Sequence, residues 1–281
     1  MTPKVNISVP YRTMMRLFAA LIISLTISAC QAEPNGHTSS QASPGVPADK
    51  RDGKTEVIVM GMLHSGHLSS RTYPLSRIET AIRTIKPDTV LTEIPPDRID
   101  AALASYRETG MVTEKRTRAF PEYTEVIIPL QAEMGFTVKG TAGWTPEIAS
   151  NRRSMLAAIE SDPERYNQWR QWEKAQQSFR ESVKQRGSGP EYIHSPEYDA
   201  AIAARFAPYV RYFDTDLGTG GWEAINKAHW HNIASELNAV SGEEQRVLIT
   251  YGAFHKYQIL RRLGERDDVI VTDALLFFDD S

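Results

Sequence analysis

Two matching tetrapeptides, each at the end of an apolar run, place the strongest constraint on the fold of this chain. Gly-Met-Leu-His at residues 61–64 follows the run 56–60, and Gly-Ala-Phe-His at residues 252–255 follows the run 246–251. Such β-branched runs predict buried strands of an α/β sheet. A glycine at a strand end permits a sharp turn, and a histidine three residues later then lies at the carboxyl edge, where open α/β sheets bind ligands. We therefore expect His64 and His255 in one composite site.

A third polar group is predicted at the same edge. The apolar spacing over residues 75–85 indicates an amphipathic helix that ends before Pro87, and residues 88–94 form a short strand stopped by two prolines. Together with the first strand they complete a β-α-β unit, whose connection suits a right-handed parallel crossover. Glu93 therefore lies at the carboxyl end of the second strand, on the same edge as His64.

The rest of the pattern predicts an α/β fold with a mixed or mostly parallel central sheet, flanked by helices and carrying a long helical middle segment. Strands are expected at 135–140, 246–251 and 268–272, and the segment of about 145–240 is helical in character, with prolines dividing it into pieces. This middle segment is either an insertion that caps the strand edge or a set of helices that simply covers the sheet.

Residues 1–30 are predicted to be a lipoprotein signal peptide. Lys4, Arg12 and Arg16 form a positive leader, and the apolar stretch 17–29 is shorter than the roughly 20 residues that span a bilayer. The ending Ile-Ser-Ala-Cys resembles a bacterial lipobox, in which the cysteine, here Cys30, is lipidated. An ordinary signal peptide with an incidental cysteine is the alternative. Since Cys30 is the only cysteine, the sequence excludes an internal disulfide and a catalytic or metal-binding thiolate in the domain.

Residues 31–54 are rich in Ser, Pro, Gly and Gln and predict a flexible linker, which leaves residues 55–281 for one α/β domain. The chain has 32 Lys and Arg residues against 35 Asp and Glu, and three of the cations lie in the leader, so the remainder carries a net charge of −6. This mildly acidic balance argues against a nucleic-acid partner.

The three converging groups, His64, Glu93 and His255, predict a specific chemistry. Two imidazoles and a carboxylate are a common ligand set for a catalytic divalent cation such as Zn, Mn or Co, with positions left for water and substrate. Without a metal, the same trio can act as a histidine general base oriented by a carboxylate. Histidines that are merely hydrogen-bonded beneath a helix are the structural alternative.

Further histidines lie near these motifs in the sequence. His67 falls in a loop rich in Gly and Ser and is a candidate for an extra ligand. His229 and His231 lie in a helix predicted over residues 222–240, where alternate residues point about 200° apart and cannot both reach one site. One of the two can face the cleft, and the other is expected at the surface.

The motif order resembles that of a known superfamily. Strand-Gly-x-x-His64, Lys86-Pro87-Asp88 followed by Glu93, and strand-Gly-x-x-His255 resemble the TraB/PrgY/GumN/Tiki superfamily and the related ChaN and erythromycin-esterase-like proteins. The resemblance covers roughly residues 56–100 and 225–275 and leaves out the middle. It implies that both histidines and the glutamate are active-site groups. Tiki proteins behave as divalent-metal-dependent peptidases, TraB and PrgY relatives limit peptide pheromone activity, and ChaN is a haem-binding lipoprotein.

One departure from that superfamily concerns the helix before the second motif. The family commonly has an Arg-Asn or Arg-Asp pair there, and this chain has His231-Asn232. The resemblance thus implies catalytic roles for Glu93, His231 and Asn232, although histidine lacks the permanent charge and forked donors of arginine.

These observations predict a metal-dependent hydrolase, peptidase- or esterase-like, tethered through Cys30 to the bacterial cell envelope on the periplasmic side or at the outer membrane. Its expected partners are a peptide or small-molecule substrate and the membrane. The alternative is a non-catalytic lipoprotein that binds haem or a peptide, with Tyr209 and Tyr212 as candidate axial ligands for haem.

Overall fold

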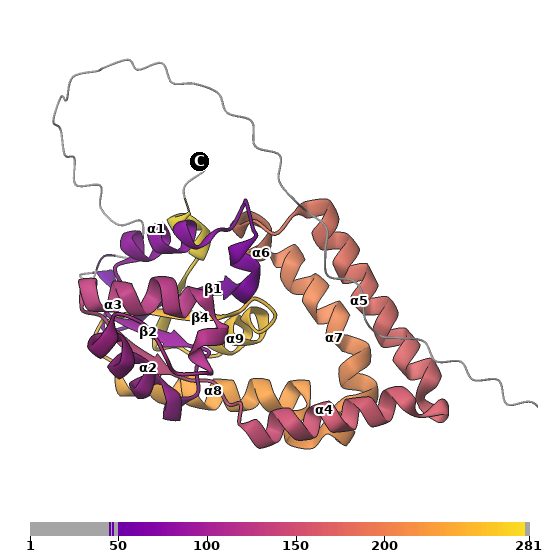
Figure 1. Ribbon diagram of the computed structural model, residues 1–281. Coiled ribbons are helices and arrows are strands. Elements are labelled where there is room, and N and C mark those ends of the chain that lie inside the picture. Colours follow the sequence, from indigo (N-terminus) through magenta and orange to yellow (C-terminus); the bar gives the residue numbers. More distant parts are fainter. Residues whose placement is uncertain (1–44, 46, 48–49, 279–281) are drawn as a thin grey trace, which may run out of the picture. The chain divides into compact units, whose positions relative to one another are not determined.

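A computed structural model describes residues 45, 47 and 50–278 of the chain. In this part the chain forms an α/β fold around one five-stranded sheet with the strand order β3-β2-β4-β1-β5, and every pair of neighbours is parallel (Figure 1). The strands are β1 (Thr55–Met62), β2 (Thr89–Thr92), β3 (Thr137–Gly140), β4 (Arg246–Gly252) and β5 (Val269–Thr272).

The sheet register places the two Gly-x-x-His motifs side by side. β1 pairs with β4 so that Gly61 lies opposite Tyr251 and Met62 lies opposite Gly252. The N–H of Ala253 donates to the carbonyl of Met62 at 2.9 Å, which extends this pairing beyond the strands. β2 flanks β4 on its other side, so the ends of β2, β4 and β1 follow one another along the carboxyl edge.

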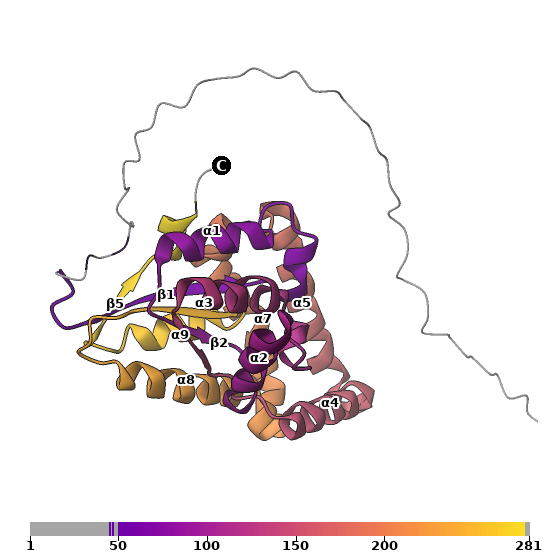
Figure 2. The same cartoon turned by 60° about the vertical axis from the view of Figure 1, so that its left-hand side comes forward.

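Helices cover both faces of the sheet. Figure 2 shows the strands between α1 and α3 on one side and α8 on the other. The helices are α1 (Leu75–Ile85), α2 (Pro96–Thr109), α3 (Ile128–Met134), α4 (Pro146–Ser161), α5 (Tyr166–Arg186), α6 (Pro190–Ile193), α7 (Pro196–Leu217), α8 (Trp222–Ala239) and α9 (Lys256–Leu263). A π-helix, Glu122–Ile127, precedes α3, and short 3₁₀ turns at His64–Leu68, Thr117–Ala119, Pro163–Arg165, Gly218–Gly220 and Ala274–Phe277 complete the described elements.

Alternation along the strands divides the core into two layers. On one face Ile58 and Met60 of β1 pack with Ile82 of α1. On the other face Val57 and Val59 pack with residues of α8 and α9. Every residue of β1 and β4 is buried. Because helices cover both faces of the sheet, the sequences of these strands are apolar nearly throughout and do not alternate between apolar and polar residues.

The middle segment forms a helical layer that packs against the carboxyl edge of the sheet. The rings of Phe179 in α5 and Phe206 in α7 lie 5.6 and 6.1 Å from that of Phe254, which follows β4 directly. The ring of Trp222, at the start of α8, stacks on His255 at 4.8 Å. Helices of the middle segment therefore line the edge where the predicted site lies.

The predicted fold class is confirmed, and the sheet is entirely parallel. The helix predicted over residues 75–85 coincides with α1. The predicted signal peptide, its Cys30 and residues 31–44 of the linker lie outside the described residues. Arg51, near the end of the predicted linker, is buried and pairs with Glu56 at 2.9 Å. In the described part of the chain, no helix is both long and apolar enough to cross a membrane.

Candidate metal and catalytic site

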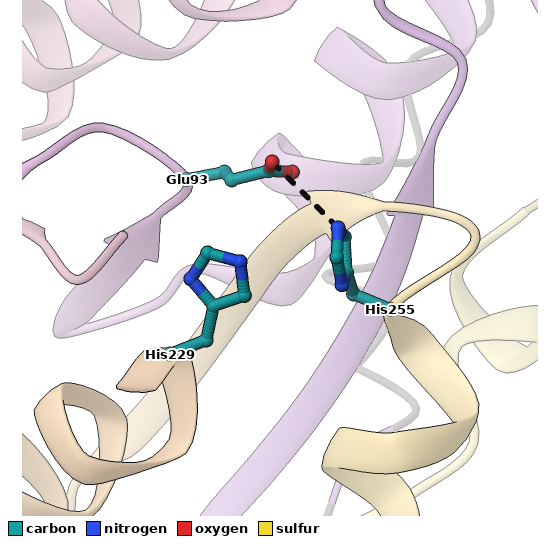
Figure 3. Close-up of side chains that lie close together, drawn as sticks. All are labelled: Glu93, His229 and His255. Atoms are coloured by element: carbon teal, nitrogen blue, oxygen red, sulfur yellow. Dashed lines mark ion pairs between the residues drawn. The ribbon is translucent and has the colours of Figure 1, made fainter. Parts of the chain in front are cut away.

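A buried cluster of one carboxylate and two imidazoles lies at the carboxyl edge of the sheet. Glu93, His229 and His255 each offer one ligand atom, and these atoms lie within 4.8 Å of one another (Figure 3). They come from the end of β2, from α8 and from the turn after β4. This cluster could hold a metal ion, because carboxylate oxygens and imidazole nitrogens are ordinary ligands of divalent transition metals.

Glu93 is held in place by the strand ends around it. Its Oε2 accepts a hydrogen bond from the N–H of Gly252 at 2.7 Å, and its own N–H donates to the hydroxyl of Tyr123 at 2.9 Å. That hydroxyl in turn donates to the carbonyl of Thr250 at 2.8 Å. Burial would raise the pKa of Glu93, but the hydrogen bond with His64 and the neighbouring histidines hold it well below its usual value. The carboxylate is therefore ionised at neutral pH.

His255 turns a free ring nitrogen toward Glu93. Asn226 uses its amide N–H to donate to the carbonyl of Trp222 at 2.7 Å, so its Oδ1 faces His255 and accepts from Nδ1 of that ring at 2.8 Å. The proton of the neutral imidazole is thus on Nδ1, and Nε2, 4.0 Å from Oε1 of Glu93, carries the lone pair. Burial lowers the pKa of His255, which keeps the ring neutral. A partner that fixes the tautomer in this way is typical of metal-binding histidines.

His229 has the opposite tautomer. The N–H of Gly143 donates to Nδ1 of His229 at 2.8 Å, so the proton of this imidazole is on Nε2. Nε2 is buried and has no hydrogen-bond partner among the described residues. In Figure 3 one ring nitrogen of His229 faces the space between Glu93 and His255. Burial and the nearby His255 lower the pKa of His229 to about 3. His229 therefore presents an unused N–H donor to the cluster.

His64 borders the cluster from the β1 side and bridges two glutamates. Its Nδ1 donates to Oε1 of Glu122 at 2.6 Å, and its Nε2 lies 3.5 Å from Oε2 of Glu93. Burial would lower the pKa of His64, but hydrogen bonds to Glu122 and Glu93 raise it to about 10. His64 also adopts a left-handed backbone conformation, with φ at +52°, a region that costs a non-glycine residue energy and that concentrates at functional sites.

A cavity of about 170 Å³ opens beside these groups. Its lining includes His64, His255, Gly252 and Tyr198. Gly252 leaves room for the site, because a Cβ atom there would lie 2.7 Å from Nε2 of His64 and 3.1 Å from Oε2 of Glu93. The second motif thus requires glycine at this position for the close approach of these side chains.

The structure brings three predicted residues together but does not bring all of them to the site. His64, Glu93 and His255 converge as predicted. His231 is exposed on α8, so the prediction that places it in the site is corrected, and His229, on the buried face of the same helix, takes that position. Asn232 lies between these faces and donates to the carbonyls of Thr141 and Ala142 at 3.2 and 3.4 Å, so it braces the loop after β3.

Other candidates from the sequence are engaged elsewhere. Both ring nitrogens of His67 are used, one toward the carbonyl of Tyr73 at 2.8 Å and one by the N–H of Leu63 at 2.8 Å. The hydroxyl of Tyr209 accepts from Arg152 at 3.0 Å, and that of Tyr212 donates to Gln171 at 2.9 Å. The two tyrosines thus make contacts within the helical layer.

Sequence reasoning missed Glu122, Asn226 and the choice of His229. The buried stripe of α8 runs through Trp222, Ile225, Asn226, His229, Ile233 and Leu237. This three-and-four spacing of apolar residues was a usable signal, since it places His229 on the covered face. Glu122 gave no such signal. It stands in a π-helix, an irregularity that is frequent at functional sites but that its sequence does not reveal.

No family model, no curated protein and no solved structure matches this chain. The resemblance of its two Gly-x-x-His motifs to the TraB/PrgY/GumN/Tiki superfamily stays a prediction.

Proposed function

We propose that this chain is a metal-dependent hydrolase of peptide or ester bonds. The observation that carries the proposal is the convergence, beside one cavity, of the ionised Glu93 with ring nitrogens of His64 and His255. The buried N–H of His229 is a further group, one without a hydrogen-bond partner among the described residues. Buried polar groups are normally satisfied, so an arrangement that leaves such a donor unused fits a site built for a ligand.

Glu93, His255 and His64 are the residues that we expect to hold a divalent ion such as Zn, Mn or Co. Asn226 accepts the Nδ1 proton of His255, which leaves the lone pair of that ring on Nε2. Glu122 accepts the Nδ1 proton of His64 and so orients Nε2 of that ring toward Glu93. When bound, the ion would lower the pKa of a coordinated water and polarise a substrate carbonyl. His64 must give up its Nε2 proton to become a ligand, so metal affinity should rise with pH.

His229 receives a different role in this proposal. To become a ligand through Nε2, its ring would have to move its proton to Nδ1 and lose the hydrogen bond from Gly143. As it stands, Nε2–H is a fixed donor in a buried site. Such donors stabilise the negative charge that develops on a carbonyl oxygen during acyl transfer. We therefore assign His229 to the binding of the substrate oxygen.

Elemental analysis of purified protein and of single variants tests the ligand set. Wild type should hold one of the three metals, and Glu93→Gln, His64→Ala and His255→Ala should lose it. His229→Gln keeps a side-chain N–H donor and should retain the metal. Exposed His231→Ala serves as the matched control and should behave as wild type. Protein that binds none of these metals, or His229→Gln that loses the metal with the others, would contradict the assignment.

Activity is tested separately, with a fluorogenic peptide library and p-nitrophenyl acetate as probes. Loss of one preorganised donor costs about 10²–10³ in kcat. We expect a loss of this order in His229→Leu, with a smaller loss in His229→Gln. If no peptide or ester is cleaved by metal-loaded protein, the hydrolase proposal fails, although the metal site can still stand.

The location of the protein belongs to the same proposal. We infer from the leader and the lipobox-like sequence that Cys30 carries the lipid and tethers the domain to the bacterial envelope. Labelling of cells with a radioactive fatty acid should mark the wild type and leave Cys30→Ser unlabelled. Labelling of both proteins alike would place the lipid elsewhere.

A further inference from the structure

A second and larger cavity lies next to the candidate site. It has a volume of about 720 Å³ and lies between the beginnings of α2 and α4 and the loop that precedes the turn Thr117–Ala119. Five cationic side chains contribute to its lining: Arg98, Lys115, Arg116, Arg152 and Arg153. This density of positive charge is unexpected in a chain whose net charge is −3.

The positive charge of this cavity is only partly compensated. Two carboxylates also line it, those of Asp97 and Glu114. Asp97 pairs with Arg98 at 3.0 Å, and Glu114 accepts hydrogen bonds from the N–H and the hydroxyl of Thr117. Within the described part of the chain, no ion pair is formed by Lys115, Arg116, Arg152 or Arg153. The cavity therefore has a local excess of positive charge.

The backbone adds to the positive electrostatic potential of this cavity. α2 and α4 both begin at this cavity, with Pro95 and Thr145 as the residues before their first turns. The amino end of a helix carries a partial positive charge, so both helices favour an anion between them. This contribution supplements the side chains, which carry the argument.

Part of the cavity wall is apolar. Trp144 lies there, half-buried, together with Pro95, Pro146 and Ala149. The guanidinium of Arg152 lies 5.8 Å from the Trp144 ring and donates to the hydroxyl of Tyr209 at 3.0 Å, which fixes its position. A ligand with a planar or apolar body could pack on this wall while its charged group meets the arginines.

The cavity and the candidate site share their supporting loops. Trp144 contacts His229, with ring centroids 6.2 Å apart, and its neighbour Gly143 fixes the tautomer of that histidine. Pro95 follows Glu93 by two residues. A ligand in the cavity therefore lies beside the residues that hold the cluster.

We propose that this cavity is a binding site for a small organic anion, in which a carboxylate or phosphate group on an apolar body meets the cationic side chains and the body packs on Trp144. The proposal does not rest on hydrolysis. If the chain cleaves peptides or esters, the cavity would select acidic substrates, and if it does not, the cavity remains a site for organic anions.

The test is titration calorimetry at low salt with three probes of similar shape: benzoate, phenyl phosphate and neutral benzamide. Wild type should bind one or both anions and bind benzamide at least about tenfold more weakly, and added salt should weaken the binding of the anions because it screens exposed charges. The two anions distinguish a carboxylate site from a phosphate site. Equal binding of benzamide, or no binding of either anion at millimolar concentration, would overturn the proposal.

Variants test whether the charge acts at this place. Lys115→Gln combined with Arg153→Gln removes two exposed cations that form no ion pair in the described chain, and should weaken anion binding about tenfold, or roughly threefold for each charge. Trp144→Leu should weaken the binding of both benzoate and phenyl phosphate. Arg180→Gln, an exposed arginine on α5, is the control and should bind as wild type. Equal weakening by Arg180→Gln would mean that only the overall charge matters and would contradict a site.

Protein that binds benzoate but cleaves no substrate contradicts the hydrolase proposal alone. Protein that cleaves substrates but binds neither anion contradicts the cavity proposal alone. Unchanged thermal unfolding of the double variant shows that its binding loss is local.

Discussion

The backbone N–H of Gly252 donates a 2.7 Å hydrogen bond to the carboxylate of Glu93. The glycine of the second motif thus fixes the carboxylate at the end of β2, and its missing side chain lets His64 approach the same carboxylate from β1. One residue therefore connects the three strand ends β2, β4 and β1. The second motif therefore positions the side chains of the site, in addition to turning the chain after β4.

Gly252→Ala should disable the site without unfolding the protein. The added Cβ would lie 2.7 Å from Nε2 of His64 and 3.1 Å from Oε2 of Glu93, so these two side chains must separate. We expect Zn affinity, measured by competition with a chelating dye, to fall at least about tenfold, since small displacements of site groups carry large costs. Gly264→Ala is the control, because its Cβ would make only ordinary contacts, 3.4 Å from the carbonyl of Arg261. Unchanged Zn affinity in Gly252→Ala would contradict the role of this glycine.

Asn226→Leu should weaken metal binding through His255. The change removes the oxygen that accepts the Nδ1 proton of His255 at 2.8 Å and so removes the preference for a free Nε2. Partners of this kind contribute about 10- to 100-fold to metal affinity. The exposed Asn167→Leu on α5 is the matched control. The same chelator competition measures both variants, and equal affinities would show that Asn226 only fills space.

Much of the fold was predictable because its signals are local. The runs of β1 and β4 are apolar throughout, and α1 shows regular three-and-four spacing before Pro87, so type and position follow from the residues themselves. The placement of His64, Glu93 and His255 followed from one rule, that the carboxyl ends of parallel strands share an edge.

The rest of the site could not be predicted in the same way. His231 was favoured because it stands where the superfamily that the motifs resemble commonly has arginine, whereas the period of α8 places His229 on the buried face. Glu122 is completely buried beside His64, and this depends on how the π-helix packs against the sheet. Its position near the start of a helix gives it the appearance of an ordinary exposed acid.

Glu56 holds a buried ionic network at the opposite, amino end of the strands. Its Oε2 lies 2.9 Å from Arg51 and 2.7 Å from Nε of Arg246, and its Oε1 accepts from the hydroxyl of Thr272 at 2.8 Å. The network ties β1 to β4, to β5 and to the segment before β1. Glu56 is completely buried, so its charge relies on these partners.

Glu56→Gln should lower the free energy of unfolding by about 3 kcal/mol, because it removes the carboxylate charge with which the buried Arg51 and Arg246 pair. Glu79→Gln is the comparison: it breaks an exposed pair with Arg83 on α1, and such pairs contribute less than about 1 kcal/mol. Urea unfolding followed by circular dichroism measures both. Similar losses in the two variants would mean that the buried network is no stronger than a surface pair.

His194 should make the protein less stable as pH falls from 6.5. Its Nε2 accepts a hydrogen bond from the N–H of Gly61 at 3.1 Å and its Nδ1 donates to the carbonyl of Pro190 at 2.9 Å, so the folded protein holds the neutral ring. Burial lowers the pKa of His194 to about 3, whereas the unfolded chain takes up a proton near 6.5. Below pH 6.5 the unfolded state binds more protons, so this contribution to stability is present above 6.5 and is lost toward pH 3.

The loss from His194 amounts to about 1.4 kcal/mol per pH unit, or about 2 kcal/mol between pH 6.5 and 5. His229, whose pKa is also lowered, destabilises the protein in the same way as pH falls. His64, whose pKa is raised to about 10, stabilises the protein fully below pH 6.5 and loses this stabilisation only as pH rises above 6.5. Urea unfolding at pH 6.5, 6 and 5 should therefore show a steep decline in wild type. In His194→Gln, which cannot titrate in this range, the decline should be shallower by that amount even if the variant is less stable at pH 7. Parallel declines in the two proteins would show that His194 is already protonated in the folded state.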